Sequence, residues 1–152
     1  MSIEIKTPQA NTGGVDIAGA LQYHNFDLVK RYAKRYDITL EEAEHLFTEC
    51  RKFLVICAMI SGPCSPSNQL DEMWHHFILH TRDYRQFCEK FFGRFIHHNP
   101  TETPSTANRS LMLETASQIF GYDPEIWPKV GKTDCSSSCN DSYCDDAPCD
   151  NG

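Results

Sequence analysis

Residue types that bind metal ions are concentrated between positions 71 and 98 of this sequence. Five of the seven histidines lie in that stretch, together with Asp71 and Cys88. Imidazole, carboxylate and thiolate groups are the ligands that a zinc-like ion takes in proteins. The spacing does not match a zinc finger or a zinc knuckle, because the stretch has no pair of cysteines separated by two residues. The chemistry that this segment predicts is therefore metal binding at a site of a different kind.

Helical spacing orients several of these side chains. Asp71 and His75 are four residues apart, so on a helix they lie together at one edge of the apolar stripe. His76 and His80 form a second such pair at the opposite, outer edge, where we expect them to matter much less to the site. Cys88 falls on the apolar face of the next predicted helix and is expected to point inward.

The chain then returns through two adjacent histidines, His97 and His98. We expect one of them to complete the site, and we choose His98 because it adjoins the Asn99-Pro100 turn. The predicted metal ligands are Asp71, His75, Cys88 and His98, with His97 as the alternative to His98. A thiolate and a carboxylate would neutralise a divalent cation, so the filled site would leave no net buried charge. The predicted cofactor is a divalent metal ion, Zn²⁺ in the first place.

Each of these residues also has an ordinary structural explanation. Cys88 could be a small core residue, and His75 could be a core histidine whose proton is held by Asp71. Adjacent histidines such as His97 and His98 are common in loops. The concentration of the residues, rather than any one of them, favours a metal site.

Helices must position these groups. Helical periodicity, a capping box at Thr39 and Glu42, and stop signals at Gly62-Pro63, Gly93 and Gly121 predict five helices. They run over residues 26–36, 40–60, 69–80, 82–92 and 107–120. No stretch shows sustained alternation of apolar and polar residues, so the predicted fold class is all-α, a compact single domain of about five helices.

Composition divides the 152 residues into three parts. Residues 1–21, rich in small and polar side chains, are predicted to be a flexible arm, and residues 22–130 the helical domain. Residues 131–152 hold five aspartates, four cysteines and few large apolar side chains, and are predicted to be a disordered acidic tail. The spacing of its cysteines does not match a structural zinc site. They could bind a soft metal loosely, form disulfides or carry a modification.

The overall charge and hydropathy restrict the partners. A net charge of −7 argues against a nucleic-acid backbone as partner. The longest uncharged apolar run, residues 53–60, is far shorter than the roughly 20 residues that span a bilayer, so we expect no membrane partner. The N-terminal residues show no basic stretch followed by an apolar core, and we expect a cytoplasmic protein. A protein partner could bind through the tail.

The block LDEMWHHFILHTRDYRQFCEKFFGRFIHHNP resembles the glycine-rich domain-containing protein-like family, a domain of unknown function. That family is typified by D-x-x-W-H, an aromatic residue, a cysteine, a glycine and H-H-x-P. The segment FGYDPEIWP resembles its closing segment. Two features depart from the family: Phe77 stands where many members have a second histidine, and the tail is rich in Asp and Ser rather than Gly. The resemblance implies no established reaction.

Three hypotheses for function follow. The first is a non-catalytic metal-binding helical module, with no catalytic residues, in which the ion fixes the helices and the HHNP segment. The second is a metal-dependent enzyme with an open coordination position, for which Glu72 or His80 could serve as a spare acid or base. The third is a metal-free interaction domain whose Cys-rich tail is the working part. We favour the first because nothing near the cluster resembles a constellation that orients a substrate.

Overall fold

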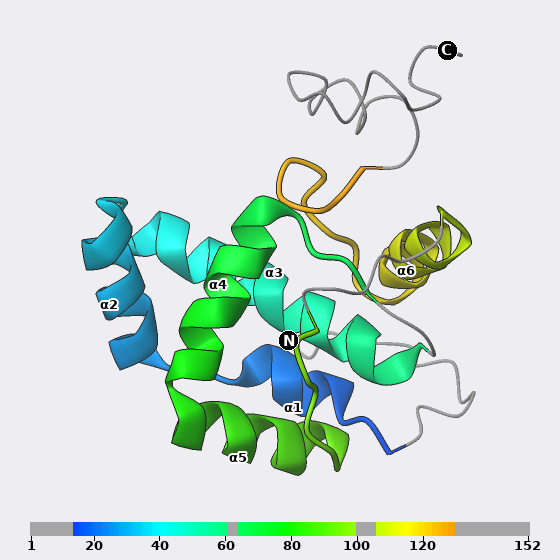
Figure 1. Cartoon of the computed structure of the whole chain (residues 1–152), viewed down its shortest axis with the longest axis horizontal. Coiled ribbons are helices and arrows are strands. Elements are labelled where there is room, and N and C mark those ends of the chain that lie inside the picture. The colour runs from blue at the N-terminus through cyan, green and yellow to red at the C-terminus, as the bar shows by residue number, and fades with distance from the viewer. Residues whose placement is uncertain (1–13, 61–63, 100–105, 130–152) are drawn as a thin grey trace, which may run out of the picture.

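The computed structural model describes residues 14–60, 64–99 and 106–129. Within these ranges the chain forms helices and no strand, which confirms the predicted all-α fold (Figure 1). The helices are α1 (Ile17–Gln22), α2 (Phe26–Tyr36), α3 (Leu40–Met59), α4 (Asn68–Leu79), α5 (Thr81–Phe92) and α6 (Thr106–Ile119). The predicted tail, residues 131–152, and the first 13 residues of the predicted arm lie outside the described residues.

Local signals in the sequence set the ends of the helices. The side chain of Asn25 accepts a hydrogen bond from the backbone of Leu28 and so caps α2, whose bounds are those predicted. The predicted capping box of Thr39 and Glu42 begins α3. Gly93 ends α5 with φ of 70°, a left-handed conformation that glycine adopts without a steric penalty.

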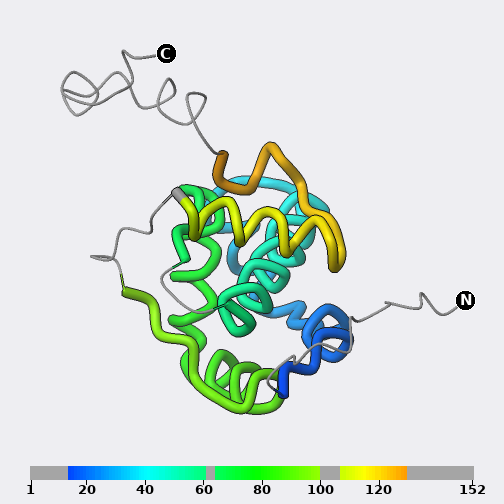
Figure 2. The backbone as a smooth tube through the Cα atoms, turned by 90° about the vertical axis from the view of Figure 1, so that its right-hand side faces the viewer, coloured from blue at the N-terminus to red at the C-terminus, as the bar shows by residue number. Residues whose placement is uncertain are grey.

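Helix α3 is the central element of the fold. It contacts α1, α2, α4 and α6, and Figures 1 and 2 show the other helices arranged around it. Four consecutive residues, Phe53 to Ile56, are fully buried, which requires partners on every side of the helix. Helix α4 packs against α2, α3 and α5, so the residues predicted to bind metal project from a helix that is held on three sides.

The predicted flexible arm is wrong for residues 17–21, which belong to α1. Ile17 and Ala20 are buried, and α1 contacts both α3 and α5. Arg51 of α3, itself almost fully buried, donates hydrogen bonds to the carbonyl oxygens of Ala20 and Leu21 at 3.3 and 2.6 Å. Small and polar composition concealed this helix, because its docking depends on contacts with segments distant in the sequence, such as Arg51 and Phe91.

The segment after α6 is also fixed to α3. The buried carboxylate of Glu49 accepts hydrogen bonds from the backbone N–H of Asp123 at 2.7 Å and from the indole N–H of Trp127 at 3.1 Å. Lys52 pairs with the other oxygen of Glu49 at 2.8 Å. Because a buried carboxylate is costly without such partners, Glu49 fixes the course of the chain over residues 123–127.

None of the helices in the described part of the chain combines the length and the apolar character that a membrane span would need.

Candidate metal site

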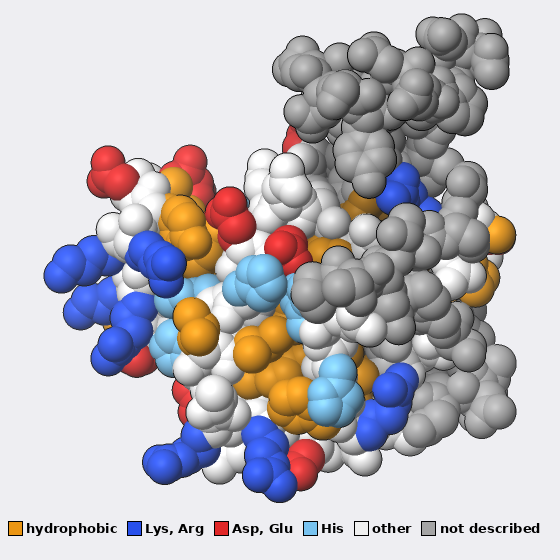
Figure 3. Space-filling view, in the orientation of Figure 1, with side chains coloured by type: hydrophobic (Ala, Val, Ile, Leu, Met, Phe, Trp, Pro, Cys, Tyr) orange, Lys and Arg blue, Asp and Glu red, His pale blue; other side chains and the backbone are white. Residues whose placement is uncertain are grey.

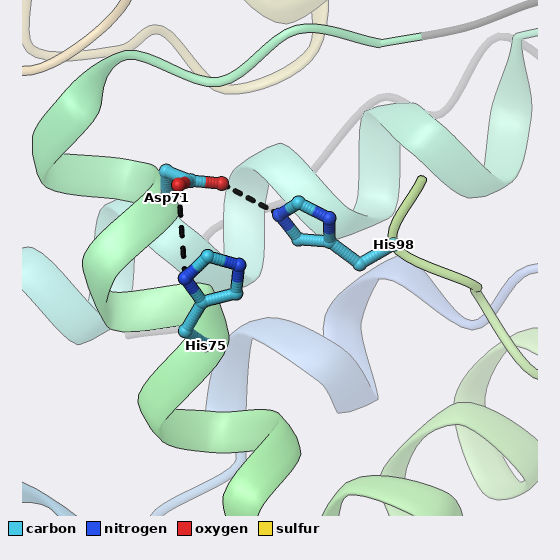
Figure 4. Close-up of side chains that lie close together, drawn as sticks. All are labelled: Asp71, His75 and His98. Atoms are coloured by element: carbon cyan, nitrogen blue, oxygen red, sulfur yellow. Dashed lines mark hydrogen bonds and ion pairs between the residues drawn. The ribbon is translucent and has the colours of Figure 1, made fainter. Parts of the chain in front are cut away.

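Three of the predicted ligands meet at one place. Asp71 and His75 project from successive turns of α4, and His98 approaches from the segment that follows α5 (Figure 4). His98 Nε2 lies 2.6 Å from one carboxylate oxygen of Asp71, and His75 Nδ1 lies 3.7 Å from the other. One nitrogen or oxygen atom from each residue lies within 4.8 Å of the others. Within the described ranges no other group of three His, Cys, Asp or Glu side chains meets this criterion.

A hydrogen-bonded chain of aromatic residues fixes the segment that carries His98. The indole N–H of Trp74 donates to the hydroxyl of Tyr84 at 3.0 Å, and that hydroxyl donates to the carbonyl of Ile96 at 2.6 Å. The ring of Trp74 also lies against that of His98, with centroids 4.3 Å apart. Residues from α4 and α5 thus hold residues 96–98 beside Asp71. Figure 2 shows the chain after α5 running back along α4.

The two imidazole rings are arranged in parallel beside the carboxylate. The rings of His75 and His98 are stacked with centroids 4.5 Å apart and an angle of 29° between their planes. Tetrahedral coordination at ordinary zinc distances separates ligand atoms by about 3.3 Å. The separations from the Asp71 oxygens, 2.6 and 3.7 Å, lie on either side of that value. A shared divalent ion would require the three donor atoms, which lie within 4.8 Å of one another, to adjust to this spacing.

The cluster lies at the edge of a cavity of about 460 Å³. Asp71, Trp74 and His98 form part of its wall, and the segment of residues 94–99 forms another part. The side chain of His98 is 11% exposed, whereas those of Asp71 and His75 are 35% and 55% exposed. Figure 3 shows histidine side chains reaching the surface over α4, next to apolar side chains. An ion held by the three residues would be accessible to small molecules.

Cys88 and His97 are not part of this cluster. Cys88 is fully buried on the inner face of α5, near Tyr84 and Ile96, and burial raises the pKa of its thiol. A thiol in such surroundings is a core residue, the alternative that its apolar stripe also allowed. His97 is exposed and its ring packs against Phe95, so of the two adjacent histidines it is His98 that faces Asp71.

His76 does not lie at the outer edge that the helical wheel indicated. It is buried between α4 and α2, where its Nε2 lies 2.9 Å from the carbonyl oxygen of Leu28. Its ring also contacts that of Tyr32 edge to face. Burial lowers the pKa of His76, and the neutral ring donates its N–H to Leu28. The wheel was wrong here because it could not show that α2 covers that side of α4.

Helical spacing places Cys57 on the buried face of α3, and nothing in the sequence connects it with Cys64. The structure brings the two side chains close enough to influence each other's pKa. Both side chains line the cavity that Asp71 and His98 also line. Their spacing of seven residues across a helix end was the signal available, but spacing alone does not show that the two side chains meet.

Comparison with protein families places the chain in one of them. A family model described as UCP032817-like matches residues 17–116. The chain belongs to the UCP032817-like family. The matched region of this UCP032817-like chain runs from α1 into α6 and contains Asp71, His75 and His98. No curated protein and no solved structure matches the chain. The family description names no reaction, in agreement with the expectation of an uncharacterised domain.

Proposed function

We propose that this UCP032817-like domain binds one divalent metal ion, with zinc as the first candidate, through Asp71, His75 and His98. The observation that carries the proposal is that donor atoms from two separate segments lie within 4.8 Å of one another. One carboxylate and two neutral imidazoles form a ligand set that zinc and other first-row divalent ions accept. The resemblance to the glycine-rich domain-containing protein-like family remains a prediction, and the proposal does not depend on it.

A purely structural role explains the positions of only two of the three residues. Asp71 and His98 could form a simple hydrogen-bonded pair, for which the 2.6 Å separation is suitable. That role leaves the position of His75 unexplained, because an exposed imidazole gains little by stacking on a second imidazole beside one carboxylate. A shared cation accounts for all three positions together.

Elemental analysis of the purified, desalted protein tests the proposal. We expect about one divalent ion per chain in the wild type and almost none in a His75→Ala, His98→Ala double variant. His97→Ala is the matched control, because His97 is adjacent in sequence and lines the same cavity but lies outside the cluster. Equal metal content in the wild type and the double variant would refute the site and direct attention to the tail cysteines.

Two observations favour a second candidate, a metal-dependent enzyme, over a closed structural site. Only three side chains in the described ranges gather at the site, whereas structural zinc sites are closed by four protein ligands. The cluster also borders a cavity that small molecules could enter. Since Cys88 does not supply a fourth ligand, we propose that one coordination position faces this cavity and accepts water or a substrate.

Cobalt substitution separates the two candidates. Co²⁺ in place of zinc gives a visible spectrum that reports the number and type of its ligands. If one position is open, added azide should change that spectrum at millimolar concentration. An unchanged spectrum would mean a closed site and would restore the non-catalytic module as the better hypothesis.

The third hypothesis, a metal-free interaction domain that binds a protein partner through its tail, stays a prediction. The tail lies outside the described residues, and the elemental analysis decides between this hypothesis and the other two.

A further inference from the structure

The second group of reactive side chains in the described structure is a pair of cysteines. Cys57 lies near the C-terminal end of α3, and Cys64 lies in the segment that leads into α4. Both are free thiols, and the two side chains lie close enough to influence each other's pKa. Cys57 is 9% exposed, whereas Cys64 is partly exposed. The thiol of Cys64 is thus accessible, and the neighbouring thiol of Cys57 is buried.

The environment activates one member of the pair. The hydrogen bond from Cys57 lowers the pKa of Cys64, whereas burial raises the pKa of Cys57. The guanidinium group of Arg94 donates to the carbonyl oxygens of Cys57 and Ala58, at 3.5 and 3.0 Å, and its positive charge opposes the effect of burial on the pKa of Cys57. An accessible thiolate next to a second thiol is the arrangement found in redox-active dithiols.

The two thiols also have access to reagents. They line the same cavity of about 460 Å³ as Asp71 and His98, together with Arg94. A small disulfide can therefore approach Cys64 without unfolding the domain. Cys50 and Cys88, by contrast, are fully buried and do not line this cavity.

We propose that Cys57 and Cys64 form a redox-active dithiol, with Cys64 as the attacking residue and Cys57 as the resolving residue. The partner is a low-molecular-weight disulfide of the glutathione type. The Cys64 thiolate attacks one sulfur of this disulfide, forms a mixed disulfide and releases one thiolate. Cys57 gives its proton to the released thiolate and attacks the sulfur of Cys64, which expels the second thiolate. The two cysteines are oxidised to one disulfide, and the small disulfide is reduced to two thiols.

This proposal stands on residues other than the three metal ligands, so each of the two can fail without the other.

The sequence provides a direct assay in the full-length chain. No lysine or arginine lies between Lys52 and Arg82, so trypsin releases both cysteines on the single peptide of residues 53–82. None of the other cysteines lies on this peptide. After treatment with oxidised glutathione, blocking of free thiols and digestion without reductant, we expect this peptide to lack two hydrogen atoms and to carry no blocking group. A peptide blocked at both cysteines, while a tail cysteine has been oxidised, would overturn the proposal.

Variants assign the roles. In Cys57→Ser the mixed disulfide should accumulate on Cys64, and in Cys64→Ser residue 57 should stay reduced. Cys88→Ser, a buried cysteine outside the cavity, is the matched control and should behave as the wild type. A mixed disulfide on Cys57 instead of Cys64 would contradict the assignment.

The wild-type chain gives a measurement that does not depend on the folding of a variant. Iodoacetamide should modify Cys64 at least about tenfold faster than Cys88 in the native protein, because only Cys64 combines access with a lowered pKa. Equal rates at the two residues would refute the activation of Cys64.

Discussion

At the scale of single residues, the site depends on one carboxylate that faces two imidazoles. Helical spacing predicted the pairing of Asp71 with His75, because residues four apart on a helix share an edge. The sequence could not decide between His97 and His98. That choice is made by Trp74 and Tyr84, which hold the backbone at Ile96 and so turn the ring of His98 toward Asp71.

The expected ligand Cys88 shows a limit of the helical wheel. The wheel correctly placed Cys88 on the buried face of α5. It could not show that the thiol meets Ile96 and its own helix neighbour Tyr84 rather than the Asp71 cluster. A residue on the buried face of a helix need not face the proposed metal site. The packing of segments distant in sequence decides which neighbours it meets.

Asp71→Asn separates metal binding from ordinary stabilisation. The change keeps the size of the side chain but removes the negative charge, so we expect zinc affinity to fall at least about 100-fold. Stability in the presence of a chelator should change by less than about 1 kcal/mol, because an amide oxygen at this position can still accept the hydrogen bond from His98. Isothermal titration with zinc and urea denaturation with EDTA measure the two effects. A large loss of stability without a loss of affinity would instead indicate a structural carboxylate.

At the scale of helices, the sequence predicted five elements to within about one residue and missed the sixth. The five carry strong signals, such as the capping box before α3 and the glycine after α5. Helix α1 is only six residues long, and two of its residues, Ile17 and Ala20, are buried. Its local signal is the N-cap Asp16 alone, and its stability comes from contacts with α3 and α5, which include the hydrogen bonds from the buried Arg51.

Arg51→Met tests whether that arginine holds α1 in place. The substitution keeps most of the buried apolar volume but removes the donor of the Leu21 carbonyl, while the Ala20 carbonyl keeps only the backbone N–H of Tyr23. We expect the free energy of unfolding to fall by about 2–4 kcal/mol in urea denaturation. Arg85→Met, on the exposed face of α5, is the control and should cost less than about 1 kcal/mol. Similar values for the two variants would show that α1 docks without Arg51.

At the scale of the whole molecule, the proposed site needs only what the described residues supply. All three proposed ligands lie in α4 and the segment after α5, and both elements are held by α3 or by each other. The family match covers the same region and ends at residue 116. The fold class was predictable from the sequence because it follows from periodicity. The composition of the site was only partly predictable, because it depends on how the segment after α5 returns to α4.

Removal of the tail tests whether the metal belongs to the helical domain. A chain that ends at residue 130 lacks Cys135, Cys139, Cys144 and Cys149 but keeps Asp71, His75 and His98. We expect it to retain about one divalent ion per chain and a melting temperature close to that of the full chain. Loss of the ion on truncation would assign metal binding to the tail cysteines.

The comparison of two adjacent histidines tests the central claim most directly. Competition titration with a chromophoric chelator gives the zinc affinity of the wild type, His98→Ala and His97→Ala. Because His98 faces Asp71 and His97 does not, His98→Ala should weaken zinc binding at least about 100-fold, while His97→Ala should change it by less than about threefold. Equal affinities for the two variants, or a larger loss for His97→Ala, would contradict the assignment of Asp71, His75 and His98 as the metal site.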